Sequence, residues 1–305
     1  MSILPNLKVS QAHLAEVATA LEKDVFRRIL LANHTVFLIG AGRSSDSTFR
    51  DDIRDELQQR PGIHGVFDVY YPEELFEELL WGGKQGRNLL DLEELLAKSV
   101  HSVVILLESP GAIAELGAFA NHEQLRNHLV VVVDKRFRKD RSFIALGPVK
   151  YLKNDTRSQI IYHDPKNPDL KKLGSEIRTV VRRHRMESEI DSTVNNPIAA
   201  QHYLRAAIHV LDPVRFADLQ FLIARVTDEE ITDSEPLLHT ALSILRRERE
   251  VVLRGEHYSL TKRGSDRLQR LFKAEKSGCE ISAALDRARV NVLSWRLRRP
   301  QRLTA

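Results

Sequence analysis

Four short apolar runs, separated by longer segments of helical periodicity, constrain the fold of the first half of this chain more than any other feature. The runs are rich in Val, Ile and Leu, and they lie at residues 35–39, 66–71, 102–107 and 129–133. Strands of such continuous apolar character are typical of parallel sheets whose two faces are covered by helices. Helices are predicted around these strands at residues 10–32, 46–59, 73–80, 89–98, 112–127 and 168–187. We therefore expect an α/β domain with a parallel sheet over residues 1–190.

Ligands of a parallel α/β sheet bind at the carboxyl ends of its strands. Glycines after the first strand would let a phosphate or a sugar approach the backbone, although a plain tight turn explains them as well. Ser45 replaces the third glycine of a G-x-G-x-x-G motif and no P-loop lysine follows, so neither a standard dinucleotide fold nor a P-loop ATPase is favoured. Of the adjacent Tyr70 and Tyr71, which point to opposite faces, at most one lines a pocket and stacks on a base. The candidate ligand contacts at the strand ends are Gly40, Ala41, Gly42, Arg43, Tyr71, Ser109, Pro110 and Gly111.

Glu115 is the candidate catalytic residue. The third strand ends before a Pro110-Gly111 turn, and Glu115 is expected in the first turn or so of the next helix. The positive end of that helix favours an ionised carboxylate. Such a carboxylate can attack the anomeric carbon of a sugar or stabilise an oxocarbenium ion. The alternative is that Glu115 only complements the helix dipole.

The second half of the chain has a different pattern. The basic segment 135–153 is predicted to be a surface loop with a short helix, and the polar stretch 191–197 to be a linker. Two helices, a third helix that begins near Pro236, a β-hairpin and a helix capped by Thr261 then follow. That order is typical of a winged-helix domain. We expect a mainly helical winged-helix domain over 198–276 and a basic C-terminal helix or tail over 277–305.

Charge is distributed unevenly between the two halves. Residues 237–305 hold 16 Lys and Arg against 7 Asp and Glu, whereas the rest of the chain holds 30 against 35. A basic region on an acidic body favours a polyanionic partner, with a solvated basic helix as the alternative. A winged helix that contacts protein instead also stays open. The candidate nucleic-acid contacts are Arg246, Arg247, Arg249, Arg254, Lys262 and Arg263.

The run from Val36 to Lys153 resembles a nucleoside deoxyribosyltransferase-like domain, which has a Rossmann-like parallel sheet. The resemblance rests on the segments 37–42, 68–75 and 108–119. More narrowly, the chain resembles the effectors of retron anti-phage systems, in which such a domain precedes a winged-helix domain. Segments 141–149 and 261–264 fit this narrower match, and the resemblance covers about residues 35–275.

The resemblance implies an N-glycosidase of nucleosides or nucleotides with a glutamate nucleophile, at the position of Glu115. It implies a toxin that degrades a nucleotide, with NAD as a candidate substrate and no separate cofactor. It implies partnership with a reverse transcriptase and its multicopy single-stranded DNA and RNA product, in a homo-oligomer or higher-order complex. The transferases carry an acid six positions before the nucleophile, where this chain has Ser109 with Glu108 beside it, so base exchange is in doubt. Members also carry a site acid near Asp91 and Glu93, either of which would contact a ribose hydroxyl.

Several classes of protein are disfavoured by the sequence. The single cysteine, Cys279, cannot form an intrachain disulfide, which fits a reducing compartment. Without a secretory signal or an apolar run long enough to span a bilayer, we expect a cytoplasmic protein that does not contact membranes. The histidines lack metal-ligand spacing, so no metal site is expected. The alternatives to an enzyme are a nucleotide-sensing winged-helix DNA-binding regulator and a catalytically inactive scaffold.

Overall fold

The computed structural model describes residues 9–42, 48–59, 66–73, 99–123, 125–187, 193–273 and 278–298. These residues form two compact units. We name residues 33–187 the sheet unit, and residues 9–32 together with 193–298 the helical unit. None of the helices in the described ranges has the length and apolarity needed to cross a membrane.

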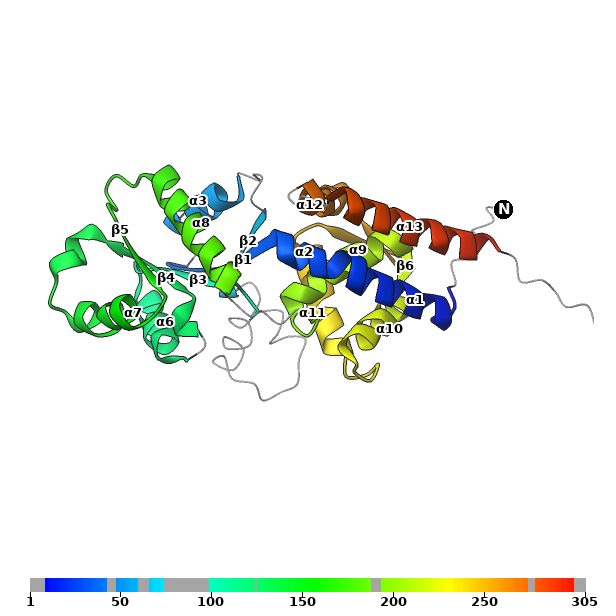
Figure 1. The fold of residues 1–305 in the computed structure, drawn as a ribbon, viewed down its shortest axis with the longest axis horizontal. Helices are drawn as coiled ribbons and strands as arrows, with labels where there is room; N and C mark the ends of the chain where they lie inside the picture. The colour runs from blue at the N-terminus through cyan, green and yellow to red at the C-terminus, as the bar shows by residue number, and fades with distance from the viewer. Residues whose placement is uncertain are drawn as a thin grey trace, which may run out of the picture. The chain divides into compact units, whose positions relative to one another are not determined.

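The sheet unit is built on five parallel strands. They are β1 (Asn33–Ile39), β2 (Val66–Tyr70), β3 (Ser102–Leu106), β4 (Leu129–Asp134) and β5 (Gln159–His163). Helices α3 (Phe49–Gln58) and α8 (Leu170–Glu187) cover one face, and α6 (Pro110–Asn121) and α7 (Lys150–Asp155) lie on the other (Figure 1). Side chains from alternate positions of all five strands pack under α3 and α8 in one apolar core. This confirms the predicted α/β class with a parallel sheet.

The strand order of the sheet reverses direction at one point. The order is β2-β1-β3-β4-β5, and each neighbouring pair is parallel. The chain runs from β1 outward to β2, returns past β1 to β3, and then continues in the opposite direction. The reversal therefore lies between β1 and β3. Ligands of open α/β sheets bind at the carboxyl ends of the strands that flank such a switch point.

Two parts of the sheet unit differ from the prediction. Strand β5 was not predicted, because this edge strand is only partly buried and lacks a continuous apolar run. The segment 135–153 is largely helical rather than a loop, with a 3₁₀ helix η3 (Lys135–Lys139) and a π-helix η4 (Ala145–Val149) before α7. The helices predicted at 73–80 and 89–98 lie outside the described residues, apart from Glu73.

The helical unit has α9 at its centre. Almost every residue of α9 (Pro197–Leu211) is buried, because helices and a strand pack around it. A three-stranded antiparallel sheet has the order β6-β8-β7. The other elements are α1 (Gln11–Leu21), the π-helix η1 (Glu22–Phe26), α2 (Arg27–Ala32), β6 (Val214–Arg215), α10 (Phe216–Thr227), α11 (Glu235–Arg247), β7 (Val251–Arg254), β8 (His257–Leu260), α12 (Lys262–Lys273) and α13 (Gly278–Leu297).

The first and last helices are grouped differently from the predicted boundaries. Residues 10–32, expected in the domain 1–190, pack within the helical unit, where the ring of His13 stacks on Trp295 at 4.1 Å between centroids. The apolar stripe of this helix shows that it must be buried, but not against which partner. Helix α13 docks on the same unit, since Arg296 donates hydrogen bonds to the carbonyls of Leu211 at 2.6 Å and Pro213 at 3.0 Å.

Candidate active site

Glu108 joins the two strand ends at the switch point. The backbone N–H of Ala41, after β1, donates a hydrogen bond of 3.1 Å to Oε1 of Glu108, after β3. A Cβ atom on Gly40 would lie 2.9 Å from the same oxygen, so the close approach favours glycine there. A Cβ atom on Gly42 would meet none of the described residues within 4 Å. The predicted ligand contacts Gly40, Ala41 and Gly42 therefore lie beside a carboxylate at the switch point.

Ser109, Pro110 and Gly111 begin α6. The hydroxyl of Ser109 caps the helix by accepting a hydrogen bond of 3.2 Å from the N–H of Ala112, and Pro110 takes the first helical position. The Ser109 hydroxyl is therefore engaged in capping. Glu108 directly precedes Ser109 in the chain, and it was not among the site residues predicted from the sequence.

Glu115 is half-buried in the second turn of α6, as its sixth residue, and not in the first turn. The helix dipole supports its ionised form less than expected, because that effect fades beyond the first turn. Ile113 is two residues earlier, so its side chain points about 200° away around the helix axis. Ile113 lines a cavity beside η4 and α7. Glu115 therefore lies on a different flank of α6 from the one that lines this cavity.

Arg50 brings a buried positive charge next to the glycine turn. Its side chain is 3% exposed, pairs with Glu73, and has its Cδ 3.3 Å from where a Cβ on Gly40 would lie. Its Nε has no hydrogen-bond partner within the part of the chain that the structure describes. Arg50 was not predicted as a site residue, although the sequence holds a signal for its burial. It precedes Ile53 and Leu57 by three and seven residues, on the apolar stripe of α3.

Tyr71 is the core member of the tyrosine pair. Its side chain is fully buried, and its hydroxyl donates a hydrogen bond of 2.6 Å to Asp51. The guanidinium groups of Arg50 and Arg54 lie 4.2 and 4.6 Å from the centroid of its ring. Burial and the hydrogen bond to Asp51 raise the pKa of Tyr71. The ring thus offers no free face to a base, contrary to the expected stacking role, whereas Tyr70 is half-buried.

Of the other predicted site residues, the structure describes some and leaves out others. Arg43, Asp91 and Glu93 lie outside the described residues. The six predicted nucleic-acid contacts are all exposed, and they come from the end of α11, the β7–β8 hairpin and the start of α12. Arg263 pairs with Glu248 at 3.4 Å. In the described ranges, no group of three or more His, Cys, Asp or Glu side chains is arranged to hold a metal ion.

Comparison with known proteins places this chain in a family. It matches the family model described as "STM3845 retron effector protein" over residues 46–252, more than half of its length. It is 27% identical over 307 residues to the Escherichia coli "Retron Ec86 putative ribosyltransferase/DNA-binding protein", covering 96% of this chain and 95% of that relative. The Escherichia coli "Retron Ec73 putative ribosyltransferase/DNA-binding protein" shares 46% identity over 63 residues, 21% of this chain and 20% of that relative. This chain therefore belongs to the STM3845 retron effector protein family.

Proposed function

We propose that this retron effector is a toxic enzyme of anti-phage defence that cleaves the N-glycosidic bond of a nucleotide or nucleoside, with Glu115 as the nucleophile. The observation that carries the proposal is that Glu115 lies on α6, the helix that begins directly after Glu108 at the β1–β3 switch point. Gly40, Arg50 and Glu108 lie at that point. The word ribosyltransferase in the names of both relatives agrees with chemistry at an anomeric carbon.

In the proposed reaction, the carboxylate of Glu115 attacks the anomeric carbon and the carbon–nitrogen bond breaks. The base leaves with the bonding electron pair. For NAD this pair neutralises the pyridinium nitrogen, so nicotinamide departs without protonation. Water then attacks the same carbon, which frees Glu115, forms the ribosyl product and releases one proton. In this reaction the nucleotide is the substrate itself, and no separate cofactor is proposed.

For the helical unit we propose a nucleic-acid-binding winged helix. Support comes from the order of its elements: α9, β6, α10, α11 and the β7–β8 hairpin. The exposed arginines and lysines at the end of α11, in the hairpin and at the start of α12 suit phosphate contacts. The names of both relatives include DNA binding. The proposed partners that restrain the toxin are the retron reverse transcriptase and its multicopy single-stranded DNA and RNA, in an oligomeric complex.

The test is release of free base from NAD, ATP and a panel of deoxynucleosides, followed by chromatography. The protein is assayed alone and with its reverse transcriptase and nucleic acid. Glu115→Gln, which keeps the shape of the side chain, should lower the rate by about 10⁴-fold or more. The matched control is Glu176→Gln on the exposed face of α8, which should keep the full rate. Equal melting temperatures of the variants confirm that folding is retained.

Two outcomes would contradict the proposal. An unchanged rate in Glu115→Gln would remove Glu115 from the chemistry. No base release under any condition would favour the alternative functions, a nucleotide-sensing DNA-binding regulator or an inactive scaffold. The exposed arginines of α11 and the hairpin are the observation that favours the regulator, which requires a sequence-specific footprint on duplex DNA.

A further inference from the structure

A second surface of the sheet unit has a composition unlike its surroundings. It is formed by η3, η4 and α7, residues 135–155, and we name it the η3–α7 surface. Three of its aromatic side chains are exposed: Phe137 at 50%, Phe143 at 86% and Tyr151 at 36%. Exposed basic side chains alternate with them along the segment, namely Arg138, Lys139, Arg141, Lys150 and Lys153. Most exposed segments carry charge without aromatic rings. Exposed aromatic side chains among basic ones therefore indicate a binding surface.

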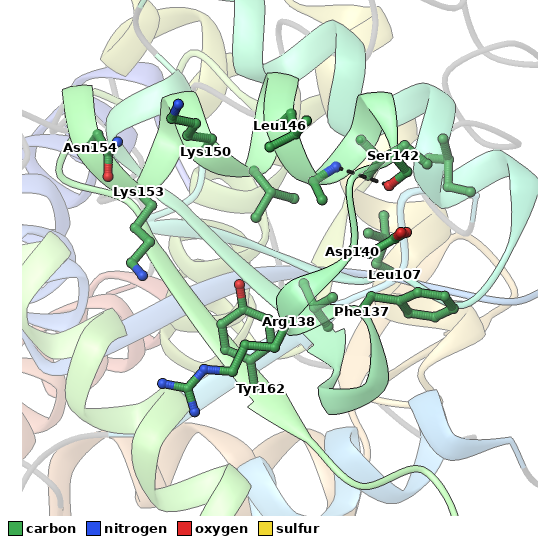
Figure 2. A pocket seen from close by; sticks show the side chains of 15 residues that line it. Leu107, Phe137, Arg138, Asp140, Ser142, Leu146, Lys150, Lys153, Asn154 and Tyr162 are labelled. Atoms are coloured by element: carbon green, nitrogen blue, oxygen red, sulfur yellow. Dashed lines mark hydrogen bonds between the residues drawn. The ribbon is translucent and has the colours of Figure 1, made fainter.

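A cavity of about 420 Å³ opens in this surface (Figure 2). Apolar side chains line its inner part, including Leu107 and Val133 at the ends of β3 and β4. Arg138, Lys153 and Tyr162 also line it, and the Arg138 guanidinium lies 5.5 Å from the centroid of the Tyr162 ring. A more open hollow of about 540 Å³, lined by Phe143 and others, lies beside η4. The volume of the first cavity is in the range of small-ligand pockets and suits a flat base.

Most of the positive charges of the η3–α7 surface are not compensated by described residues of the sheet unit. Lys135 and Arg136 are neutralised by Asp164 at 2.5 Å and Asp134 at 2.6 Å, and these contacts lower the pKa of both carboxyls. The five basic side chains that alternate with the aromatic rings make no ion pair with any described residue. The segment 135–155 has two carboxylates of its own, Asp140 and Asp155, against seven Lys and Arg. The described part of this surface therefore carries an excess of positive charge that suits an anionic partner.

Glu115 does not belong to this surface. The residues of α6 that line the two hollows are Ile113, Gly117, Ala120 and Asn121, which share one flank of the helix. Glu115 lies on the other flank, as argued above. The basic residues of α11, the hairpin and α12 belong to the helical unit and are not part of the η3–α7 surface. An occupant of this surface therefore has to be recognised by its own contacts.

We propose that the η3–α7 surface binds single-stranded nucleic acid. Exposed aromatic rings stack on bases that are not already stacked in a duplex, while unpaired Lys and Arg side chains contact the phosphates. One base would enter the 420 Å³ cavity, with its phosphates near Arg138 and Lys153. A duplex would satisfy the charges but would leave Phe143 without a base to stack on. The proposal is independent of glycosidase activity, because it uses neither Glu115 nor the switch point.

The experiment measures binding of the full-length protein to fluorescein-labelled dT12 and to a hairpin duplex of equal charge, by anisotropy over a range of salt. Phe143→Ala should weaken binding of dT12 by about 5- to 150-fold, the range for one lost stacking contact, and leave duplex binding unchanged. Met186→Ala, at an equally exposed apolar side chain in α8, is the matched control and should have no effect.

A second variant tests the charges. Lys150→Ala with Lys153→Ala should reduce the slope of log affinity against log salt by about 1.4, since each phosphate contact to a single strand contributes about 0.7. The control pair Lys171→Ala with Lys172→Ala, exposed on α8, should keep the slope of the wild type. Glu115→Gln should bind dT12 as the wild type does, which separates this test from that of the active site.

Several results would overturn the proposal. The first is a wild-type protein that does not bind dT12. The second is a combined result, in which Phe143→Ala keeps the dT12 affinity of the wild type and the Lys150→Ala, Lys153→Ala variant keeps its salt slope. Equal losses for dT12 and the duplex in Phe143→Ala would remove the stacking argument. If the variants lost binding only to phosphatidylglycerol vesicles, the surface would instead be a membrane contact.

Discussion

The substitution Gly264→Ala tests how tightly α12 packs in the helical unit. A Cβ atom on Gly264 would lie 2.2 Å from the carbonyl oxygen of Glu250 and 3.0 Å from its carbonyl carbon. Both are backbone atoms, and the same oxygen accepts a hydrogen bond of 2.9 Å from the N–H of Thr261. No side-chain rotation can relieve this contact. Alanine therefore requires the start of α12 to move by about 1 Å away from the residue that precedes β7.

The expected cost follows from two opposing effects. Overpacking of this kind typically costs about 1–3 kcal/mol, and contact with backbone puts this site at the upper end. The higher helix propensity of alanine offsets up to about 1 kcal/mol. We expect a net loss of about 2 kcal/mol in the free energy of unfolding of the helical unit. Urea unfolding followed by far-UV circular dichroism would measure it as a lower midpoint at an unchanged slope.

Gly117→Ala is the matched control for this substitution. Gly117 lies inside α6, and no described residue comes within 4 Å of its Cβ position, so alanine should stabilise the sheet unit by about 0.5–1 kcal/mol. The reasoning would be refuted if Gly264→Ala matched or exceeded the wild type in stability. It would also be refuted if both substitutions shifted the midpoint in the same direction.

The remaining predictions concern buried polar groups. Desolvation by burial lowers the pKa of His101 to about 3 and that of His184 to about 4, below the ordinary value of about 6.5. Below pH 6.5 these histidines take up protons in the unfolded chain but not in the folded one. The free energy of unfolding should therefore be highest above pH 6.5 and fall toward pH 4, by up to about 1.4 kcal/mol per pH unit for each histidine. Urea titrations at several pH values would measure this fall. A flat profile between pH 6.5 and 4.5 would contradict this assignment. In α9, Arg205 donates from Nε to Glu250 at 2.7 Å with both side chains buried, so Glu250→Gln should destabilise the helical unit by about 3–5 kcal/mol. Arg205→Met with Glu250→Leu should recover most of this loss, and a double variant as unstable as Glu250→Gln alone would argue against the buried charge as the cause.

The sequence by itself determined the elements whose signal is local. Continuous apolar runs identify β3, β4 and the second half of β1, because a strand buried on both faces is apolar at most positions. The hairpin of the helical unit was also predictable, since Gly255 sits in the turn with a φ of +60°. Among the candidate site residues, the glycine turn and the start of α6 were located from the strand–turn–helix pattern.

Only the tertiary structure decided which elements meet. Strand β5 could not be predicted, because an edge strand needs no continuous apolar run. Residues 10–32 were assigned to the wrong unit, because an apolar stripe shows that a helix is buried but not which elements it packs against. Tyr71 and Tyr70 look alike in the sequence, and packing under Arg50 placed Tyr71 in the core. Glu108 reaches Ala41 only because β1 and β3 are neighbours in the sheet, although 67 residues separate them along the chain. Burial and long-range pairing are properties of the whole fold, and a pattern read along the chain cannot contain them.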